Sequence, residues 1–380
     1  MKFIKNPWHL HAKPGIINFF NPSTNFRTIQ IEKERLIRPQ EPIKPYPYYS
    51  QDITFENNKA GISLAGTLSL PSKEGVFPVV ILISGSGPQN RDEELLGHKP
   101  FLVLSDFLTR NGIAVLRYDD RGTALSKGDF KTATSADFAT DVESAIAYLK
   151  TRKEINTKNI GLIGHSEGGL IAPMVASKSK DVAFIVLLAG TGIQGDRLLL
   201  LQQKLIGKAS GISDDDLQKS KLTNRKVFDI VNKSSNLEKL NLDLTNYIKQ
   251  TLKDNLNTGK PVGMSDDEFV NLQVKQIANP WMQYFIKYNP APTLEMVKCP
   301  VLAINGEKDL QVPPKENLEA IKSALSKGGN KKVTTKVLPN LNHLFQECKT
   351  GSPDEYATIE QTFSPTALSE ILKWLQMQTK

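Results

Sequence analysis

The strongest constraint on the fold of this chain is a set of short apolar, β-branched runs that alternate with amphipathic stretches. A continuous run such as residues 79–83 (VVILI) is typical of a strand that is buried on both faces of a sheet. The further runs of this kind are residues 113–116, 160–163, 182–188, 301–304 and 333–338. Residues 52–56 and 62–70 instead alternate apolar and polar side chains, as antiparallel strands do.

The stretches between these runs predict helices. In residues 138–149 the apolar side chains recur at helical spacing and form one stripe, and residues 101–108 show a similar face. Thr134 with Asp137 predicts a capping interaction at the start of the first of these helices. Strands that alternate with helices imply parallel strands joined by right-handed crossovers. We therefore expect an α/β protein with a mostly parallel sheet and helices on both faces.

The alternation stops at about Gly195 and resumes after Pro290. The intervening block has helical periodicity without buried strand runs, in residues 198–206, 217–231, 244–252 and 269–277. A helical block inserted into an α/β sheet is most simply a cap domain. We predict a Pro-rich basic arm (1–47), the first part of the core (48–194), a helical cap (195–290) and the second part of the core (291–380).

Composition and charge exclude several classes of protein. The longest apolar run, residues 183–190, is far shorter than the roughly 18 residues that span a bilayer. Two cysteines, Cys299 and Cys348, cannot form a disulfide framework, and the absence of a Cys/His cluster predicts no metal site. The net charge is +8, but residues 1–48 carry +5 of it, which leaves a diffuse excess on the remainder. We therefore expect neither nucleic acid nor membrane as a partner.

The N-terminal arm has no apolar segment of the kind found in secretory signals. As written, the chain is predicted to be cytoplasmic, or exported if its natural N-terminus is longer.

A pentapeptide after the buried run 160–163 carries the main chemical signal. Gly164-His165-Ser166-Glu167-Gly168 has the form GxSxG and leads into a predicted helix. The two outer glycines leave room for a tight strand–helix turn, and such a turn holds the serine hydroxyl above the sheet in a strained backbone conformation. This context predicts that Ser166 is a nucleophile.

A nucleophilic serine needs a base, and the sequence holds five histidines. His9 and His11 lie in the arm, His165 lies inside the turn, and His98 precedes a helix, where we expect a capping or surface role. His343 follows the last strand run, and the loop after a parallel strand emerges at the same sheet edge as Ser166. His343 is therefore the predicted base.

An acid should orient the imidazole and stabilise its protonated form. Two candidates follow run 301–304 at the same edge of the sheet, Asp309 and Glu307. We predict Asp309, because it lies further along the loop and reaches further. The oxyanion needs two backbone donors. We predict the N–H of Glu167 for one, and Ser86, with Gly87 as the alternative, in the glycine-rich loop after residues 79–83 for the other.

These motifs give the chain a clear resemblance. ISGSGPQNRD (83–92), YDDRG (118–122), GHSEGG (164–169), NGEKDLQVP (305–313) and LNH (341–343) occur in this order. The chain resembles serine hydrolases of the α/β-hydrolase superfamily, and more narrowly bacterial capped carboxylesterases of the dienelactone-hydrolase-like and acyl-CoA-thioester-hydrolase-like kind. Where the superfamily usually has a histidine in the oxyanion loop, this chain has Ser84.

The resemblance implies an α/β-hydrolase fold with an inserted helical cap, and a carboxylesterase that acts on small-molecule esters without a cofactor. Short to medium acyl chains are favoured, and an aromatic cluster in the cap, Trp281, Tyr284 and Phe285, is a candidate wall of the acyl pocket. The same cluster could instead be a packing seam. The alternatives are an aminopeptidase or acyl thioesterase with the same triad, and a non-catalytic binding protein on a hydrolase scaffold.

Overall fold

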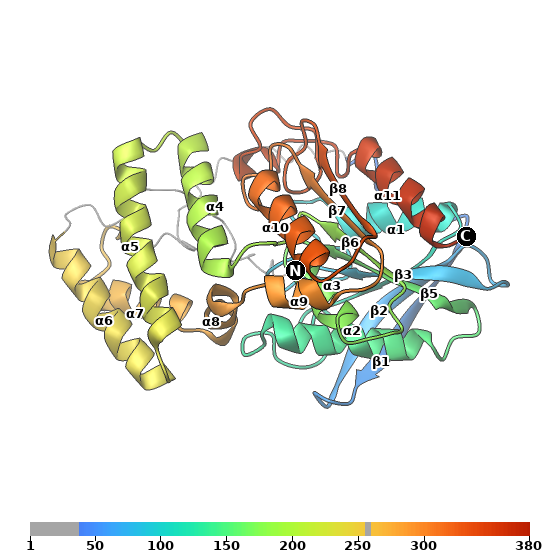
Figure 1. The fold of residues 1–380 in the computed structure, drawn as a ribbon, viewed down its shortest axis with the longest axis horizontal. Coiled ribbons are helices and arrows are strands. Elements are labelled where there is room, and N and C mark those ends of the chain that lie inside the picture. Colours follow the sequence, from blue (N-terminus) through green and yellow to red (C-terminus); the bar gives the residue numbers. More distant parts are fainter. Residues whose placement is uncertain (1–37, 255–259) are drawn as a thin grey trace. The chain divides into compact units, whose positions relative to one another are not determined.

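The computed structural model describes residues 38–254 and 260–380 (Figure 1). Their contacts divide into two compact units. Residues 38–193 and 290–380 contain the sheet, and residues 194–254 and 260–289 form the helical unit. The predicted helical insertion, 195–290, differs from the helical unit by one residue at each end. Most of the predicted N-terminal arm, 1–47, lies outside the described residues.

The described part of the sheet has eight strands in the order β1-β2-β4-β3-β5-β6-β7-β8. The strands are β1 (Tyr49–Asn57), β2 (Ile62–Leu70), β3 (Phe77–Ile83), β4 (Ala114–Tyr118), β5 (Ile155–His165), β6 (Phe184–Leu188), β7 (Val301–Gly306) and β8 (Val333–Leu338). β1 pairs antiparallel with β2, and β2 pairs antiparallel with β4. All pairs from β4 to β8 are parallel. The mostly parallel sheet and its antiparallel beginning, both predicted from the apolar pattern, are confirmed.

One strand prediction was wrong in its burial. Residues 333–338 were expected to form a strand buried on both faces, but β8 lies at the edge of the sheet and alternates exposed and less exposed side chains. Val337 is 48% exposed. The sequence of β8, VTTKVL, holds polar residues at positions where an interior strand would need apolar ones, and an edge strand tolerates them because one side faces solvent.

Helices cover both faces of the sheet (Figure 1). α1 (Pro100–Arg110) packs beside α11 (Pro365–Gln378), while α2 (Ser135–Leu149) packs beside α3 (Gly168–Ala176). α3 also contacts α9 (Ala291–Met296), which packs on α10 (Pro314–Lys327). At the start of α2, Asp137 Oδ2 accepts hydrogen bonds from Thr134 N and Oγ1 at 2.9 and 2.7 Å, so the predicted capping interaction is present.

The helical unit comprises α4 (Gly195–Ala209), α5 (Asp214–Lys233), α6 (Leu237–Asp254), α7 (Asp266–Ile277) and α8 (Pro280–Lys287). Its two ends are joined to each other. Gly195 N donates to the carbonyl oxygen of Tyr288 at 3.2 Å, and a side chain at Gly195 would collide with the backbone of Phe285. The chain therefore enters and leaves this unit through adjacent segments, and only glycine allows them to lie so close together.

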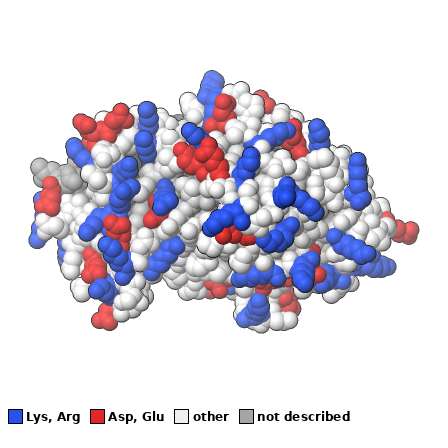
Figure 2. Space-filling view, in the orientation of Figure 1, with Lys and Arg blue, Asp and Glu red and all other residues white. Residues whose placement is uncertain are grey.

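On the face drawn in Figure 2, basic and acidic side chains are interspersed, without a broad area of one sign. No helix within residues 38–254 and 260–380 combines the length and the apolar character that crossing a lipid bilayer requires.

Candidate active site

Ser166 lies in the turn between β5 and α3. Its φ is +53°, in the left-handed region that non-glycine residues rarely adopt. The turn is fixed by hydrogen bonds from Ser166 N to Leu188 O at 2.8 Å and from Gly169 N to Ser166 O at 3.0 Å. A strained serine held by its neighbours at the carboxyl end of a parallel strand is the arrangement that the GxSxG pattern predicts.

The two outer glycines of this turn are required by close backbone contacts. A side chain at Gly164 would collide with the backbone of Gly168, at the start of α3. A side chain at Gly168 would collide with the carbonyl oxygen of Ile83, at the end of β3. The strand–helix turn can therefore be this tight only with glycine at both positions.

The structure brings Asp309 and His343 together. Asp309 Oδ2 lies 2.8 Å from His343 Nδ1, and both side chains are buried. The other carboxylate oxygen, Oδ1, accepts the N–H groups of Gln311 and Val312, each at 2.8 Å. The Asp309 carboxylate is thus held in one orientation. A neutral His343 donates its Nδ1–H to this carboxylate, which leaves Nε2 of His343 unprotonated.

The competing acid does not reach the imidazole. Glu307 is exposed, and its carboxylate accepts the N–H of Asn340 at 3.0 Å. The loops that carry Asp309 and His343 are also joined through their backbones, since Lys308 N donates to Leu341 O at 2.9 Å. In the part of the chain that the structure describes, Ser166 Oγ and the ring of His343 do not hydrogen-bond to each other. Such bonds often tighten only when substrate binds.

The loop after β3 lies against Ser166. A Cβ atom added to Gly85 would lie 3.2 Å from the Cβ atom of Ser166. The N–H of Gly85 already donates to Glu93 Oε1 at 2.7 Å. Within residues 38–254 and 260–380, the backbone N–H groups of Ser86 and Gly87 donate to no acceptor. The assignment of these two N–H groups to an oxyanion hole stays a prediction.

Glu167, the other predicted donor, follows Ser166 at the N-terminal end of α3. Its side chain is buried and accepts a hydrogen bond from Ser135 Oγ at 2.6 Å.

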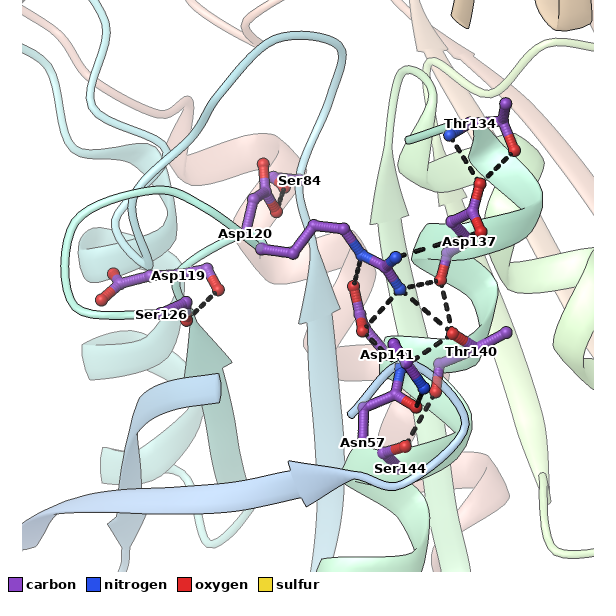
Figure 3. Close-up of polar contacts among 12 residues, drawn as sticks. Asn57, Ser84, Asp119, Asp120, Ser126, Thr134, Asp137, Thr140, Asp141 and Ser144 are labelled. Atoms are coloured by element: carbon purple, nitrogen blue, oxygen red, sulfur yellow. Dashed lines mark hydrogen bonds and ion pairs between the residues drawn. The ribbon is translucent and has the colours of Figure 1, made fainter. Parts of the chain in front are cut away.

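Asp120 braces the loop after β3 at both ends. Its Oδ1 accepts the hydroxyl of Ser84 at 2.7 Å (Figure 3), and its Oδ2 accepts the N–H of Gln89 at 3.0 Å. Burial raises the pKa of Asp120 well above its ordinary value, although the hydrogen bonds from Ser84 and Gln89 act in the opposite direction. Ser84, which stands where the superfamily usually has a histidine, thus helps to hold this loop through its hydrogen bond to Asp120.

The residue after Asp120 fastens the same segment to the helix layer. Arg121 Nε donates to Asp141 Oδ2 at 2.7 Å, and Asn57 Nδ2 donates to Asp141 Oδ1 at 2.7 Å (Figure 3). Burial raises the pKa of Asp141, while the contacts with Arg121 and Asn57 act in the opposite direction. The YDDRG motif therefore ties β4, α2 and β1 together behind the loop.

The expectation for His98 was wrong. His98 is 1% exposed, its Nδ1 lies 2.9 Å from Thr362 Oγ1, and its Nε2 lies 2.9 Å from Tyr356 O. It precedes α1, as predicted, but its ring turns into the protein, where burial lowers its pKa. Its distant partners, which follow β8 in sequence, could not be read from the local pattern.

The aromatic cluster lies on α8 in the helical unit. The rings of Trp281 and Phe285 stack with centroids 5.1 Å apart, and Tyr284 stacks on Tyr288 at 5.5 Å. Trp281 and Phe285 are buried, and α8 contacts α4, α5 and α7. Their role in a substrate pocket stays a prediction.

Sequence reasoning missed two buried groups beside Ser166. Glu93 and His165 are 5% and 7% exposed, and Glu93 Oε1 lies 2.9 Å from His165 Nδ1. The two residues are 72 positions apart in the sequence, with α1, β4 and α2 between them, so no spacing pattern pointed to the pair.

Solved structures share this arrangement of sheet and helices. The chain superposes on the α/β hydrolase GrgF from Penicillium sp. sh18 with a TM-score of 0.55 at 16% identity, over 87% of this chain and 99% of that one. It also superposes on the Pyrococcus furiosus esterase Pf2001 with a TM-score of 0.54 at 18% identity, over 90% and 98% of the two chains. The strand order and the parallel crossovers give this chain the α/β-hydrolase fold, as its sequence predicted.

Family membership follows from the sequence match. Residues 60–339 match the X-Pro dipeptidyl-peptidase (S15) family, and the chain belongs to this family. Among curated proteins, it is 27% identical to esterase EstD of Thermotoga maritima over 342 residues, which cover 88% of this chain and 69% of EstD. It is 28% identical to the rat mitochondrial acyl-coenzyme A thioesterase 2 over 43% of this chain and 32% of that protein.

Proposed function

We propose that this chain is a serine carboxylesterase that cleaves esters of short to medium acyl chains through an acyl-enzyme on Ser166. His343 Nε2 takes the proton of Ser166 as Oγ attacks the ester carbonyl. Asp309 keeps the imidazole in the tautomer that leaves Nε2 unprotonated, and it stabilises the imidazolium once formed. His343 then protonates the leaving alcohol, and water repeats the cycle on the acyl-enzyme.

The tetrahedral oxyanion would be held by the N–H of Glu167 and by the N–H of Ser86, with Gly87 as the alternative second donor. The open N–H groups of Ser86 and Gly87 support this assignment. Each such donor is worth about 10²–10³ in rate. The brace from Asp120 would keep these donors in place without reorganisation during the reaction.

The observation that carries the proposal is the Asp309–His343 hydrogen bond, in loops at the same sheet edge as the strained Ser166. The similarity to esterase EstD over most of the chain supports an ester as the substrate. The helical unit, with Trp281, Tyr284 and Phe285, remains the predicted source of selectivity for the acyl group.

Labelling with a fluorophosphonate, followed by peptide mapping, tests the nucleophile without knowledge of the substrate. We expect the label on Ser166, none on the Ser166→Ala variant, and unchanged labelling of Ser72→Ala, in which an exposed serine is removed. A protein that resists the probe, or carries it on another residue, would contradict the proposal and favour the non-catalytic alternative.

Hydrolysis of thioesters or peptides is the second candidate function, because a Ser-His-Asp triad can also catalyse these reactions. The family description favours a dipeptidyl-peptidase, and the match to acyl-coenzyme A thioesterase 2 favours a thioesterase. A panel of nitrophenyl esters, acyl-CoAs and X-Pro anilides separates the three reactions. We expect the highest kcat/KM on the esters, and a higher value on either other class would replace the proposed substrate.

A further inference from the structure

The Glu93–His165 pair has no part in the proton transfers described above, yet it lies among the groups that perform them. His165 directly precedes Ser166, and its ring centroid is 4.8 Å from that of His343. Its Nδ1 contacts Glu93 Oε1 at 2.9 Å, and its Nε2 contacts the backbone carbonyl oxygen of His343 at 2.9 Å.

The partners of His165 determine its charge. A carbonyl oxygen can only accept, so Nε2 of His165 must carry a proton to bond to His343 O. When Glu93 is a carboxylate, its Oε1 can only accept, as it does from the N–H of Gly85, and Nδ1 then carries a proton as well. Both contacts are hydrogen bonds at once when the ring is an imidazolium facing a carboxylate.

The electrostatic surroundings favour the same state. Burial lowers the pKa of His165, but the charge of Glu93, the hydrogen bonds to Glu93 and to His343 O, and the more distant charge of Asp309 raise it, with a net increase. The titratable groups that face the ring from the packed loops are Glu93, Asp309 and His343.

These three bonds connect three separate loops. Through Gly85 N, Glu93 holds the loop that carries the free N–H groups. Through His343 O, His165 holds the backbone of the residue that we propose as the base. His165 directly precedes Ser166, so these bonds link the turn that carries Ser166 to both other loops.

We propose that Glu93 and His165 form a buried ion pair of positioning residues that sets the oxyanion loop and the His343 loop relative to Ser166. The inference rests on the proposed function of Ser166 and His343. It predicts that loss of the pair lowers kcat and leaves KM little changed, because the bonds align the reacting groups and do not bind substrate.

The variant Glu93→Gln tests the pair, because an amide cannot satisfy all three bonds. If its oxygen takes the place of Oε1, the ring loses its counter-charge, becomes neutral and turns a lone pair toward either the amide or His343 O. If its nitrogen takes that place, Gly85 N loses its acceptor. We expect kcat to fall roughly 10- to 100-fold with KM within about threefold of wild type, as for a misalignment of the reacting groups.

Glu94→Gln is the matched control, since Glu94 is an exposed glutamate next in sequence. It should keep the wild-type kcat. The rate of fluorophosphonate labelling supplies a second readout that is independent of the chosen substrate, and it should fall in Glu93→Gln alone. Equal kcat and equal labelling rates in the two variants would overturn the proposal.

The charge state is measured in the wild-type protein, so the test survives if Glu93→Gln does not fold. The sequence has five histidines, and ¹⁵N NMR of selectively labelled rings resolves their protonation. We expect both nitrogens of His165 to carry protons at neutral pH, and a neutral ring would overturn the ion pair. Turnover that survives in Ser166→Ala would instead refute the proposed function, whatever the charge of His165.

Discussion

Asp309→Asn should nearly abolish turnover, for a reason that can be worked out from three contacts. Asp309 Oδ1 accepts two backbone N–H groups, from Gln311 and Val312, so the amide of an asparagine must place its oxygen there. Its NH₂ group then takes the place of Oδ2 and donates to His343 Nδ1. The imidazole is forced into the tautomer with its proton on Nε2, and it can no longer accept the proton of Ser166. The loss in kcat expected from a wrong tautomer is about 10⁴-fold.

The assay is the hydrolysis of a nitrophenyl ester by wild type, Asp309→Asn and Glu307→Gln, with thermal unfolding of each protein as a check on the fold. Glu307→Gln should keep wild-type turnover, because the side chain of Glu307 is exposed and accepts a hydrogen bond from the Asn340 backbone, away from His343. If Asp309→Asn retained turnover within tenfold of wild type while folded, the tautomer argument would be refuted. A loss in Glu307→Gln alone would exchange the roles of the two acids.

Three further outcomes are expected. Ser166→Ala should remove ester hydrolysis and leave the thermal midpoint nearly unchanged; a large drop in the midpoint would mean that the side chain mainly supports the fold. Gly168→Ala should lower the free energy of unfolding by about 3 kcal/mol or more, since the added methyl meets the carbonyl oxygen of Ile83; a urea midpoint equal to wild type would contradict the packing of the turn. Asp120→Asn should flatten the loss of stability with rising pH. Because the pKa of Asp120 is raised on folding, the folded protein binds more protons than the unfolded chain between the unfolded pKa, about 3.9, and the folded pKa. In wild type, the free energy of unfolding therefore falls as the pH rises through this range. Urea midpoints measured across that range check this, and parallel curves for the two proteins would disprove it.

The strands of the sheet core could be predicted because their signal is local. Interior strands of a parallel sheet are apolar on both faces, so each of the runs in β3 to β7 announces a strand without knowledge of its neighbours. β8 shows where this reasoning stops. Its VTTKVL sequence fits an edge strand, and only the pairing order reveals which strand lies at the edge.

Asp309 and His343 could be proposed from sequence because each follows a strand run, and parallel strands bring their following loops to one edge. Glu93 offered no such signal, and although Asp120 follows a strand run, its partners Ser84 and Gln89 lie in another loop. Glu93 has a φ of +51° in an irregular loop, and its partners are Gly85, earlier in the same loop, and His165, at the end of β5. Contacts that depend on loop conformation at this level are tertiary properties, and residue spacing does not encode them.

The joined ends of the helical unit have an evolutionary consequence. Because Gly195 and Tyr288 are joined by a backbone hydrogen bond, the segment between them is an insertion whose two ends lie together. It is inserted between β6 and α9. Descendants of such a chain can shorten, lengthen or exchange the inserted segment while the strands around Ser166 keep their register. Differences in sequence and length among related proteins are therefore expected to concentrate between Gly195 and Tyr288. The unit that contains the sheet is expected to vary less.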